Sequence, residues 1–271
     1  MFPIDTGFIF ALRQEAVGIL DSLKRTKMTR GDGLTFYTGK IGDMSIAVVL
    51  SGVGQKNAEE AAKKLIDVFE PKSICSAGYA GGLSARLKQL AICVPEQVIR
   101  ESDGKVLCLS ESIPRKTSLM PNKLTLITVN DVVETPEQKL MLHECTSAEI
   151  VDMETFVIAD VCRERNVPFY AFRVVLDAAD DQIPKDIANV LGNLDKGFPR
   201  ISGMILGNIW SRPSVVLDFM SLKKRAFTAA ERLARFAIAE LSRKRQTAIP
   251  CSPTGGVRTC KEEGFGLYSR K

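Results

Sequence analysis

Histidine and tryptophan are nearly absent from this chain of 271 residues, which contains one of each. The histidine, His143, lies in a polar stretch of helical character, so we expect a surface residue rather than a catalytic base. The seven cysteines include no CxxC pair and no spacing typical of a zinc site. The sequence therefore predicts no metal centre. Cysteines within apolar runs, such as Cys75 and Cys93, are expected to be reduced core residues of a cytoplasmic protein.

Long uncharged hydrophobic runs are also lacking. No stretch approaches the roughly 20 apolar residues that a membrane-spanning helix requires. The N-terminal sequence MFPIDTGFIFAL has no basic region and carries Asp5 ahead of a short apolar run, which is unlike a signal peptide. We therefore expect a soluble protein without stable membrane insertion.

A basic patch on the folded body is missing as well, although the net charge is +5. Residues 242–271 contain seven basic and two acidic side chains, and this excess accounts for the whole net charge. A nucleic-acid partner is therefore not expected. Glycine, proline, serine and threonine dominate residues 247–256, so we predict one domain over 1–241 and a basic, disordered tail over 242–271.

Apolar periodicity predicts alternating strands and helices, which is typical of the α/β class. Helices are predicted at 14–24, 55–69, 153–164 and 221–243. Strands are predicted at 7–12, 34–38, 45–50, 73–77, 90–98, 106–109, 124–129 and 169–176.

Two acidic segments carry the strongest functional signal. Asp152, Met153 and Glu154 open a predicted helix, and Arg173 and Asp177 close an apolar strand. Taken alone, an acid at a helix start favours the helix dipole, and an aspartate after a strand is commonly a loop residue. Together they lie where an open α/β sheet exposes its chemistry, beyond the carboxyl ends of its strands. This combination indicates an enzyme.

Four motifs in one order extend that signal. They are SGVGQKNAEEAAKKL at 51–65, CSAGYAGGLSARLK at 75–88, IVDMETFVIADVCRERNVPF at 150–169 and FRVVLDAADDQ at 172–182. Together they resemble the purine nucleoside phosphorylase and methylthioadenosine/S-adenosylhomocysteine nucleosidase superfamily, over residues 7–182 with a compressed segment at 106–142. The resemblance implies a three-layer α/β fold, with a central mixed twisted sheet flanked by helices. It also implies cleavage of the N-glycosidic bond of a 5′-modified adenine nucleoside, such as methylthioadenosine or S-adenosylhomocysteine.

The resemblance assigns the two acidic segments to opposite sides of the scissile bond. Glu154 matches the family acid that binds the ribose hydroxyls, with Met153 against the sugar. A carboxylate suits this role because it accepts both hydroxyl hydrogen bonds and stabilises an oxocarbenium-like transition state. Asp177 matches the acid that protonates purine N7, which requires a raised pKa. Glu15 matches the base that activates water, and Arg173 the arginine that supports the nucleophile.

The base-binding region departs from the family pattern. The nucleosidases place a loop with a phenylalanine where this chain has residues 130–133, so we expect Val133 there and stacking on Tyr79 instead. Gly78 and Ala80 flank Tyr79 and are expected to line the substrate. The expected partner is thus a small nucleoside, bound by a homo-oligomer, with a dimer favoured.

The choice of nucleophile depends on groups that bind anions. The related hexameric phosphorylases of bacteria have an arginine where this chain has Ser76 and a serine where it has Tyr79, so a bidentate phosphate contact is lost. Hydrolysis with release of adenine is therefore favoured, without a cofactor. Phosphorolysis stays open, with phosphate as co-substrate and Arg13 as an anion contact. The amides of residues 51–54 are a weaker candidate for phosphate binding.

The sequence also fits a different substrate and a function without catalysis. Residues 194–236 resemble the hopanoid-associated phosphorylases, which implies an adenosyl-hopanoid as a further candidate substrate. The apolar residues near 204–217 fit either a channel for such a group or, as we favour, plain core. The chain also fits a non-catalytic nucleoside-binding relative in which the shortened segment has removed turnover. A nicotinamide dehydrogenase is disfavoured because no GxGxxG follows a predicted strand.

Overall fold

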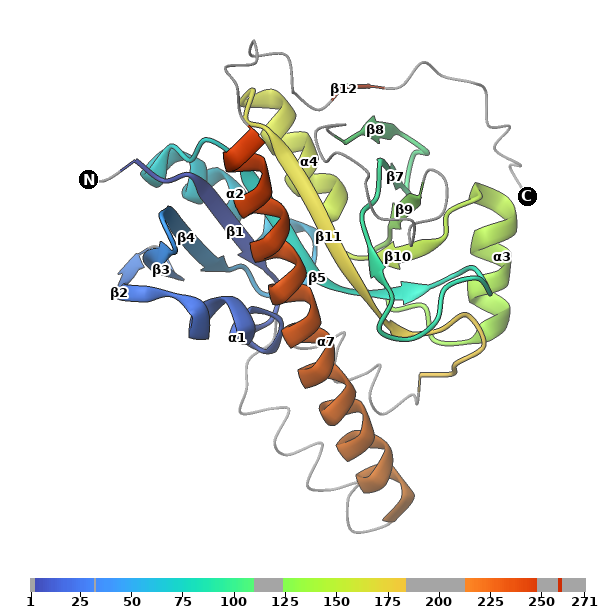
Figure 1. Ribbon diagram of the computed structural model, residues 1–271. Helices are drawn as coiled ribbons and strands as arrows, with labels where there is room; N and C mark the ends of the chain where they lie inside the picture. Colours follow the sequence, from blue (N-terminus) through green and yellow to red (C-terminus); the bar gives the residue numbers. More distant parts are fainter. Residues whose placement is uncertain (1–2, 32, 110–123, 184–212, 248–257, 260–271) are drawn as a thin grey trace.

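A mixed, twisted sheet with helices on both faces forms the body of the protein (Figure 1). The computed structural model describes residues 3–31, 33–109, 124–183, 213–247 and 258–259. Within these residues the sheet follows the order β12-β8-β7-β9-β10-β5-β1-β4-β3-β2, and β11 pairs with β5 and β6 beside this path. The predicted three-layer α/β fold is confirmed.

Four parallel strands make the centre of the sheet. β1 pairs with β4 and β5, and β5 pairs along its other edge with β11. Most of their side chains are buried, as expected for parallel strands covered on both faces. The four are β1 (Thr6–Phe10), β4 (Met44–Leu50), β5 (Ile74–Gly82) and β11 (Phe169–Asp177).

One edge of the sheet is a hairpin that the sequence did not predict in full. β3 (Leu34–Ile41) pairs antiparallel with both β4 and β2 (Lys24–Gly31). All eight residues of β2 are exposed, and four of the eight are lysine or arginine. Without a buried face, β2 has no apolar alternation to reveal it, and its strand form depends on pairing with β3.

The other side of the sheet contains shorter strands. The predicted strand 90–98 is divided by Pro95, which lacks the N–H that a ladder requires. β10 joins this side to the centre, because it pairs antiparallel with Gly81 and Gly82 at the end of β5. The strands are β6 (Ile92–Cys93), β7 (Gln97–Arg100), β8 (Val106–Cys108), β9 (Thr125–Thr128), β10 (Ile150–Asp152) and β12 (Arg258–Thr259).

Two pairs of helices cover the sheet. Helices α1 (Arg13–Ser22) and α7 (Pro213–Thr247) pack on one face, where α7 crosses β11 (Figure 1). Gly18 permits their contact, because a Cβ there would lie 2.6 Å from the Cβ of Ala234. Helices α2 (Gln55–Phe69) and α4 (Thr155–Glu164) pack on the opposite face, and α3 (Pro136–Thr146) precedes β10.

The C-terminal region departs from the sequence prediction in two respects. Helix α7 continues to Thr247, past the predicted domain limit at 241, and β12 pairs with β8 within the segment expected to be disordered. Cys108 of β8 is disulfide-bonded, which departs from the reduced state expected of the cysteines. No spacing in the sequence indicates a disulfide at this position. Cys75, Cys93, Cys145 and Cys162 are reduced.

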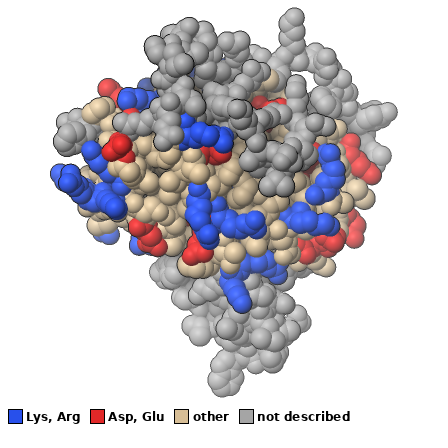
Figure 2. Space-filling view, in the orientation of Figure 1, with Lys and Arg blue, Asp and Glu red and all other residues tan. Residues whose placement is uncertain are grey.

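Charged side chains of both signs share the face in Figure 2, where lysine and arginine lie among aspartate and glutamate. Among the helices of the described residues, none is long and apolar enough to cross a membrane. The same residues contain no group of three or more histidine, cysteine, aspartate or glutamate side chains able to hold a metal ion.

Candidate active site

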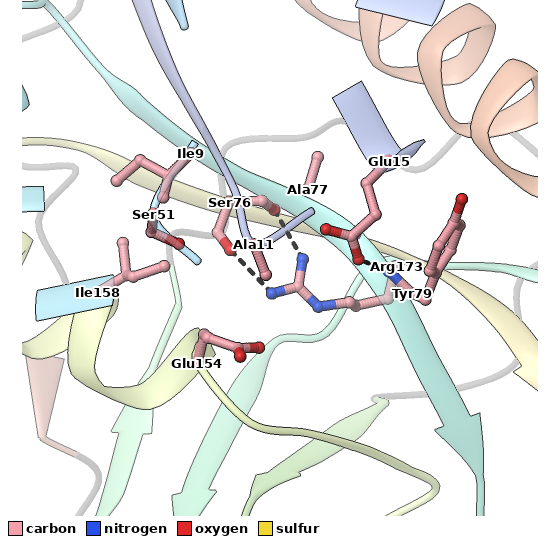
Figure 3. Close-up of a pocket in the computed structure, with 11 residues that line it drawn as sticks. Ile9, Ala11, Glu15, Ser51, Ser76, Ala77, Tyr79, Glu154, Ile158 and Arg173 are labelled. Carbon is pink, nitrogen blue, oxygen red and sulfur yellow. Dashed lines mark hydrogen bonds between the residues drawn. The ribbon is translucent and has the colours of Figure 1, made fainter. Parts of the chain in front are cut away.

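A small cavity lies beside β1, β5 and β11, near the first residues of α1 and α4 (Figure 3). Its interior of about 10 Å³ has room for about one water molecule. Five predicted site residues line it: Glu15, Gly78, Tyr79, Glu154 and Arg173. Its other lining residues are Ile9, Ala11, Ser51, Ser76, Ala77 and Ile158.

Glu15 is fixed by two backbone amides. It lies in the first turn of α1, where its Oε2 accepts a hydrogen bond from Leu12 N at 2.8 Å and its Oε1 one from Tyr79 N at 2.8 Å. Gly78 must lack a side chain, because a Cβ there would lie 2.7 Å from Oε1. Burial raises the pKa of Glu15, against the lowering effect of the amides and Arg173. An oriented carboxylate of raised pKa is suited to accept a proton.

Glu154 is positioned where α4 begins. Its Oε1 accepts a hydrogen bond from Gly54 N at 2.7 Å, across the turn formed by residues 51–54. The Gly54 amide is thus occupied by a carboxylate, which weakens the case for a phosphate site at this turn. Burial raises the pKa of Glu154, and the negative charge of Asp152 raises it further. Its surroundings therefore favour any positive charge that develops in the cavity.

Arg173 is buried, and its five N–H groups already have acceptors. They reach Asp152 Oδ2, the Oγ and main-chain oxygen of Ser76, Thr155 Oγ1 and the carbonyl of Phe172, at 2.6–3.1 Å. In Figure 3 the guanidinium points to Ser76, with Glu15 and Glu154 on either side of it in this view. These contacts give Arg173 a positioning role, and its predicted support of the nucleophile stays a prediction.

Asp152 is the partner that makes this network possible. Its Oδ2 lies 2.8 Å from Arg173 in a fully buried ion pair, while Oδ1 accepts from Thr128 Oγ1 and from the Thr155 amide. The sequence marked Asp152 as part of an acidic pair but did not indicate its partner. Burial of both charges is tolerable only because each carboxylate oxygen and each N–H has a partner.

Asp177 closes β11 opposite Gly81, outside the lining of the cavity. Its Oδ2 lies 2.6 Å from Nζ of Lys139, a fully buried lysine of α3. Burial raises the pKa of Asp177, Lys139 opposes that rise and Asp181 adds to it. Sequence reasoning missed Lys139 because a lysine in a polar helix is normally exposed.

The remaining predicted residues surround these groups. The Tyr79 hydroxyl donates to Ala226 O of α7 at 2.8 Å, and the ring packs against the α1/α7 core, so its stacking on a base stays a prediction. Met153 and Val133 each pack against the small core around β9 and β10. Ala80 is buried in the core beneath α2 and α4. None of these last three lines the cavity.

The family model described as the phosphorylase superfamily matches residues 5–113 and 125–206. The chain belongs to the phosphorylase superfamily. The chain is 27% identical over 197 residues to a curated relative, a 5′-methylthioadenosine/S-adenosylhomocysteine nucleosidase of Buchnera aphidicola. The alignment covers 64% of this chain and 78% of the relative.

Solved structures of two Helicobacter pylori proteins have the same fold. A Helicobacter pylori nucleosidase variant with 5′-methylthioadenosine in its active site superposes with a TM-score of 0.69 at 18% identity, covering 89% of this chain and all of that chain. A futalosine hydrolase mutant of the same organism gives 0.68 at 18% identity, covering 89% and 99%. The predicted superfamily is confirmed, and with it the class of enzyme, a nucleosidase or phosphorylase that cleaves N-glycosidic bonds.

Proposed function

We propose that this member of the phosphorylase superfamily hydrolyses the N-glycosidic bond of an adenine nucleoside modified at C5′ and releases adenine. The observation that carries the proposal is the full use of the Arg173 N–H groups inside a cavity that also contains Glu15 and Glu154. The curated relative named as a methylthioadenosine/S-adenosylhomocysteine nucleosidase supports the substrate class.

The electrostatics of the cavity favour water over phosphate as the nucleophile. A phosphate ion would meet two carboxylates, and Arg173 has no N–H left to bind it. Arg13 donates to Tyr37 Oη at 3.1 Å and does not line the cavity. Loss of a bidentate arginine contact removes the strongest form of phosphate recognition in proteins. Neutral water carries no such penalty.

Three carboxyl groups have separate roles in the proposed reaction. Glu154 accepts hydrogen bonds from the ribose hydroxyls and stabilises the positive charge that grows on the sugar. Glu15 takes a proton from water as the water oxygen bonds to the anomeric carbon. The electron pair of the breaking C–N bond passes to the base, and Asp177 gives its proton to N7, so that a neutral base leaves. Glu15 ends protonated and Asp177 ionised, and exchange with solvent resets both.

The group at C5′ is the finer part of the proposal. Methylthioadenosine and S-adenosylhomocysteine are the substrates that we expect. The apolar residues near 204–217, which fit a channel for an adenosyl-hopanoid or plain core, lie outside the residues whose side chains the structure describes. A cytoplasmic homodimer that needs no cofactor stays a prediction.

Product analysis tests the reaction. The full chain is incubated with adenosine, methylthioadenosine and S-adenosylhomocysteine, each with and without inorganic phosphate. We expect adenine and a free sugar at a rate that phosphate does not raise. A phosphate-dependent rate with a sugar 1-phosphate as product would replace hydrolysis by phosphorolysis. Tight nucleoside binding without any product would instead favour a binding protein.

A further inference from the structure

Lys139 occupies an unusual position for a lysine, because its side chain has no exposure to solvent. Its Nζ donates to the carbonyl of Ala178 at 2.7 Å and to that of Asp181 at 2.8 Å, in the loop that follows Asp177. The third neighbour is Oδ2 of Asp177 at 2.6 Å. A lysine is seldom buried in this way unless its charge is compensated. Asp177 supplies that compensation.

The two oxygens of Asp177 have different surroundings. Oδ2 has almost no exposure, and it forms an ion pair with Nζ of Lys139 at 2.6 Å. The side chain as a whole keeps 15% exposure, so a substrate can approach the carboxyl group only from the side of Oδ1. An ammonium beside Oδ2 favours negative charge on that oxygen, and any proton on the carboxyl group is therefore favoured on Oδ1.

We propose that Lys139 is a positioning residue of the acid: it holds Oδ2 of Asp177 inside the protein and leaves Oδ1 as the oxygen that protonates the departing base. This inference rests on the proposed function, in which Asp177 is the acid. It adds a residue on α3, a helix that lies outside the four motifs, to the machinery for leaving-group activation.

The loop after Asp177 joins the same arrangement. Asp181 Oδ2 accepts from Ala178 N at 2.7 Å and from the Gln89 side chain at 2.6 Å, which closes a tight turn. The backbone of this turn supplies the two carbonyls that bind Lys139. Lys139 therefore positions both the acid and the loop, and it makes Asp177 a stronger acid than burial alone would.

Two charges act on the Asp177 carboxyl group. The ammonium of Lys139 on α3 lowers its pKa, and the carboxylate of Asp181 in the following loop raises it. Burial opposes ionisation of Asp181, but the Gln89 side chain and the Ala178 amide lower its pKa, and the charges of Lys139 and of Arg225 on α7 lower it further. The strands β5 and β10 contribute Gly81 and Val151, which carry no charge.

The first test is the pH profile of kcat/KM for Lys139→Met, which removes the charge at similar length. The alkaline limb reports ionisation of the acid. It should move to higher pH by about 1–3 units, as expected for loss of an opposite charge within hydrogen-bond distance. Lys105→Met is the matched control, because Lys105 pairs with Asp160 outside the cavity, and its limb should not move. A lower rate with an unmoved limb in Lys139→Met would overturn the proposal.

A second measurement uses the wild-type lysine, in case Lys139→Met does not fold. Protein labelled with ¹⁵N-lysine is titrated by NMR, and the chemical shift of Lys139 Nζ should change over the pH range in which Asp177 ionises. In Asp177→Asn, a substitution of the same shape, this change should disappear. A wild-type chemical shift that does not change with pH, or a change that persists in Asp177→Asn, would contradict the proposal.

The same variants separate this inference from the proposed function. If Asp177→Asn releases adenine as fast as wild type, Asp177 is not the acid and both ideas fail. If Asp177→Asn is inactive while Lys139→Met keeps the wild-type alkaline limb, the acid stands and only the role of Lys139 is lost.

Discussion

The two ends of the site treat their buried carboxyl groups in different ways. At the sugar end, Glu15 and Glu154 are held by backbone amides. Arg173 acts on them by charge alone, because its N–H groups are bound to Asp152, Ser76, Thr155 and Phe172. At the base end, Asp177 has a dedicated ammonium from Lys139. The sugar end therefore leaves its carboxyl groups without a dedicated ammonium, whereas the base end provides one.

The difference agrees with the chemistry proposed for each end. A cavity that develops positive charge benefits from uncompensated carboxylates, although each one costs stability. A group that must release a proton benefits from a nearby cation, which makes it a stronger acid. The resemblance assigns the three acids different roles, and their neighbours in the structure supply a physical reason for the difference.

Loss of the base at the sugar end should have the largest effect. We expect Glu15→Gln to lower kcat by about 10²- to 10⁴-fold, the usual contribution of a positioned base. Because both oxygens of Glu15 accept from amides, the –NH₂ group of the introduced glutamine would face an N–H donor, and the thermal midpoint should fall too. Steady-state kinetics and thermal unfolding measure the two effects. Unchanged turnover would exclude Glu15 as the base.

The buried ion pair of the sugar end should matter most for stability. Arg173→Met leaves Asp152 charged and unpaired, and it should lower the free energy of unfolding by about 3–5 kcal/mol. Denaturant unfolding gives the value. The double variant Asp152→Asn/Arg173→Met should recover part of the loss. Arg235→Met is the control, because its pair with Glu231 is exposed and should be worth less than about 1 kcal/mol.

Glu154 should lower the free energy of unfolding, unlike the ion pair of Arg173 and Asp152, which should raise it. Its pKa is raised in the folded protein, so below the unfolded value near about 4.3 it is protonated in both states and costs nothing. As pH rises through the folded pKa, ionisation in the buried site lowers stability. Glu154→Gln should therefore raise the free energy of unfolding at pH 8 by about 1–2 kcal/mol and lose that advantage at pH 4.

The kcat/KM of Glu154→Gln should fall although its stability at pH 8 rises, because the introduced glutamine accepts fewer hydroxyl hydrogen bonds and carries no charge. Unfolding at the two pH values, together with kcat/KM, checks both expectations. Equal stability of Glu154→Gln and wild type at pH 8 would mean that the cavity compensates Glu154 as fully as Lys139 compensates Asp177. The comparison between the two ends would then fail.

The smallest effect concerns the space beside Glu15. Gly78→Ala places a Cβ 2.7 Å from Oε1, so the carboxylate must turn from the Tyr79 amide, and kcat should fall about tenfold, or about 1.4 kcal/mol. Gly31→Ala is the matched control, since nothing lies within 4 Å of its Cβ position. If the two variants have equal turnover, the orientation of Glu15 does not depend on this glycine.

Much of the framework could be predicted from the sequence. The central strands have continuous apolar runs, and helices such as α2 have an apolar face, so local pattern and tertiary burial agree there. β2 was missed because an exposed edge strand carries no such pattern. The family resemblance was enough to predict that Glu15, Glu154 and Arg173 belong to one site, and all three line the cavity.

The sequence by itself determined the family, the class of reaction and the candidate acidic residues of the site, because these depend on local motifs and their order. Only the tertiary structure decided what each charge faces. Arg173 meets Ser76 across 97 positions of sequence, and Lys139 meets Ala178 across 39. Hydrogen-bond saturation and burial are properties of such distant contacts, and they determine whether a buried charge binds an anion, supports a neighbour or tunes an acid.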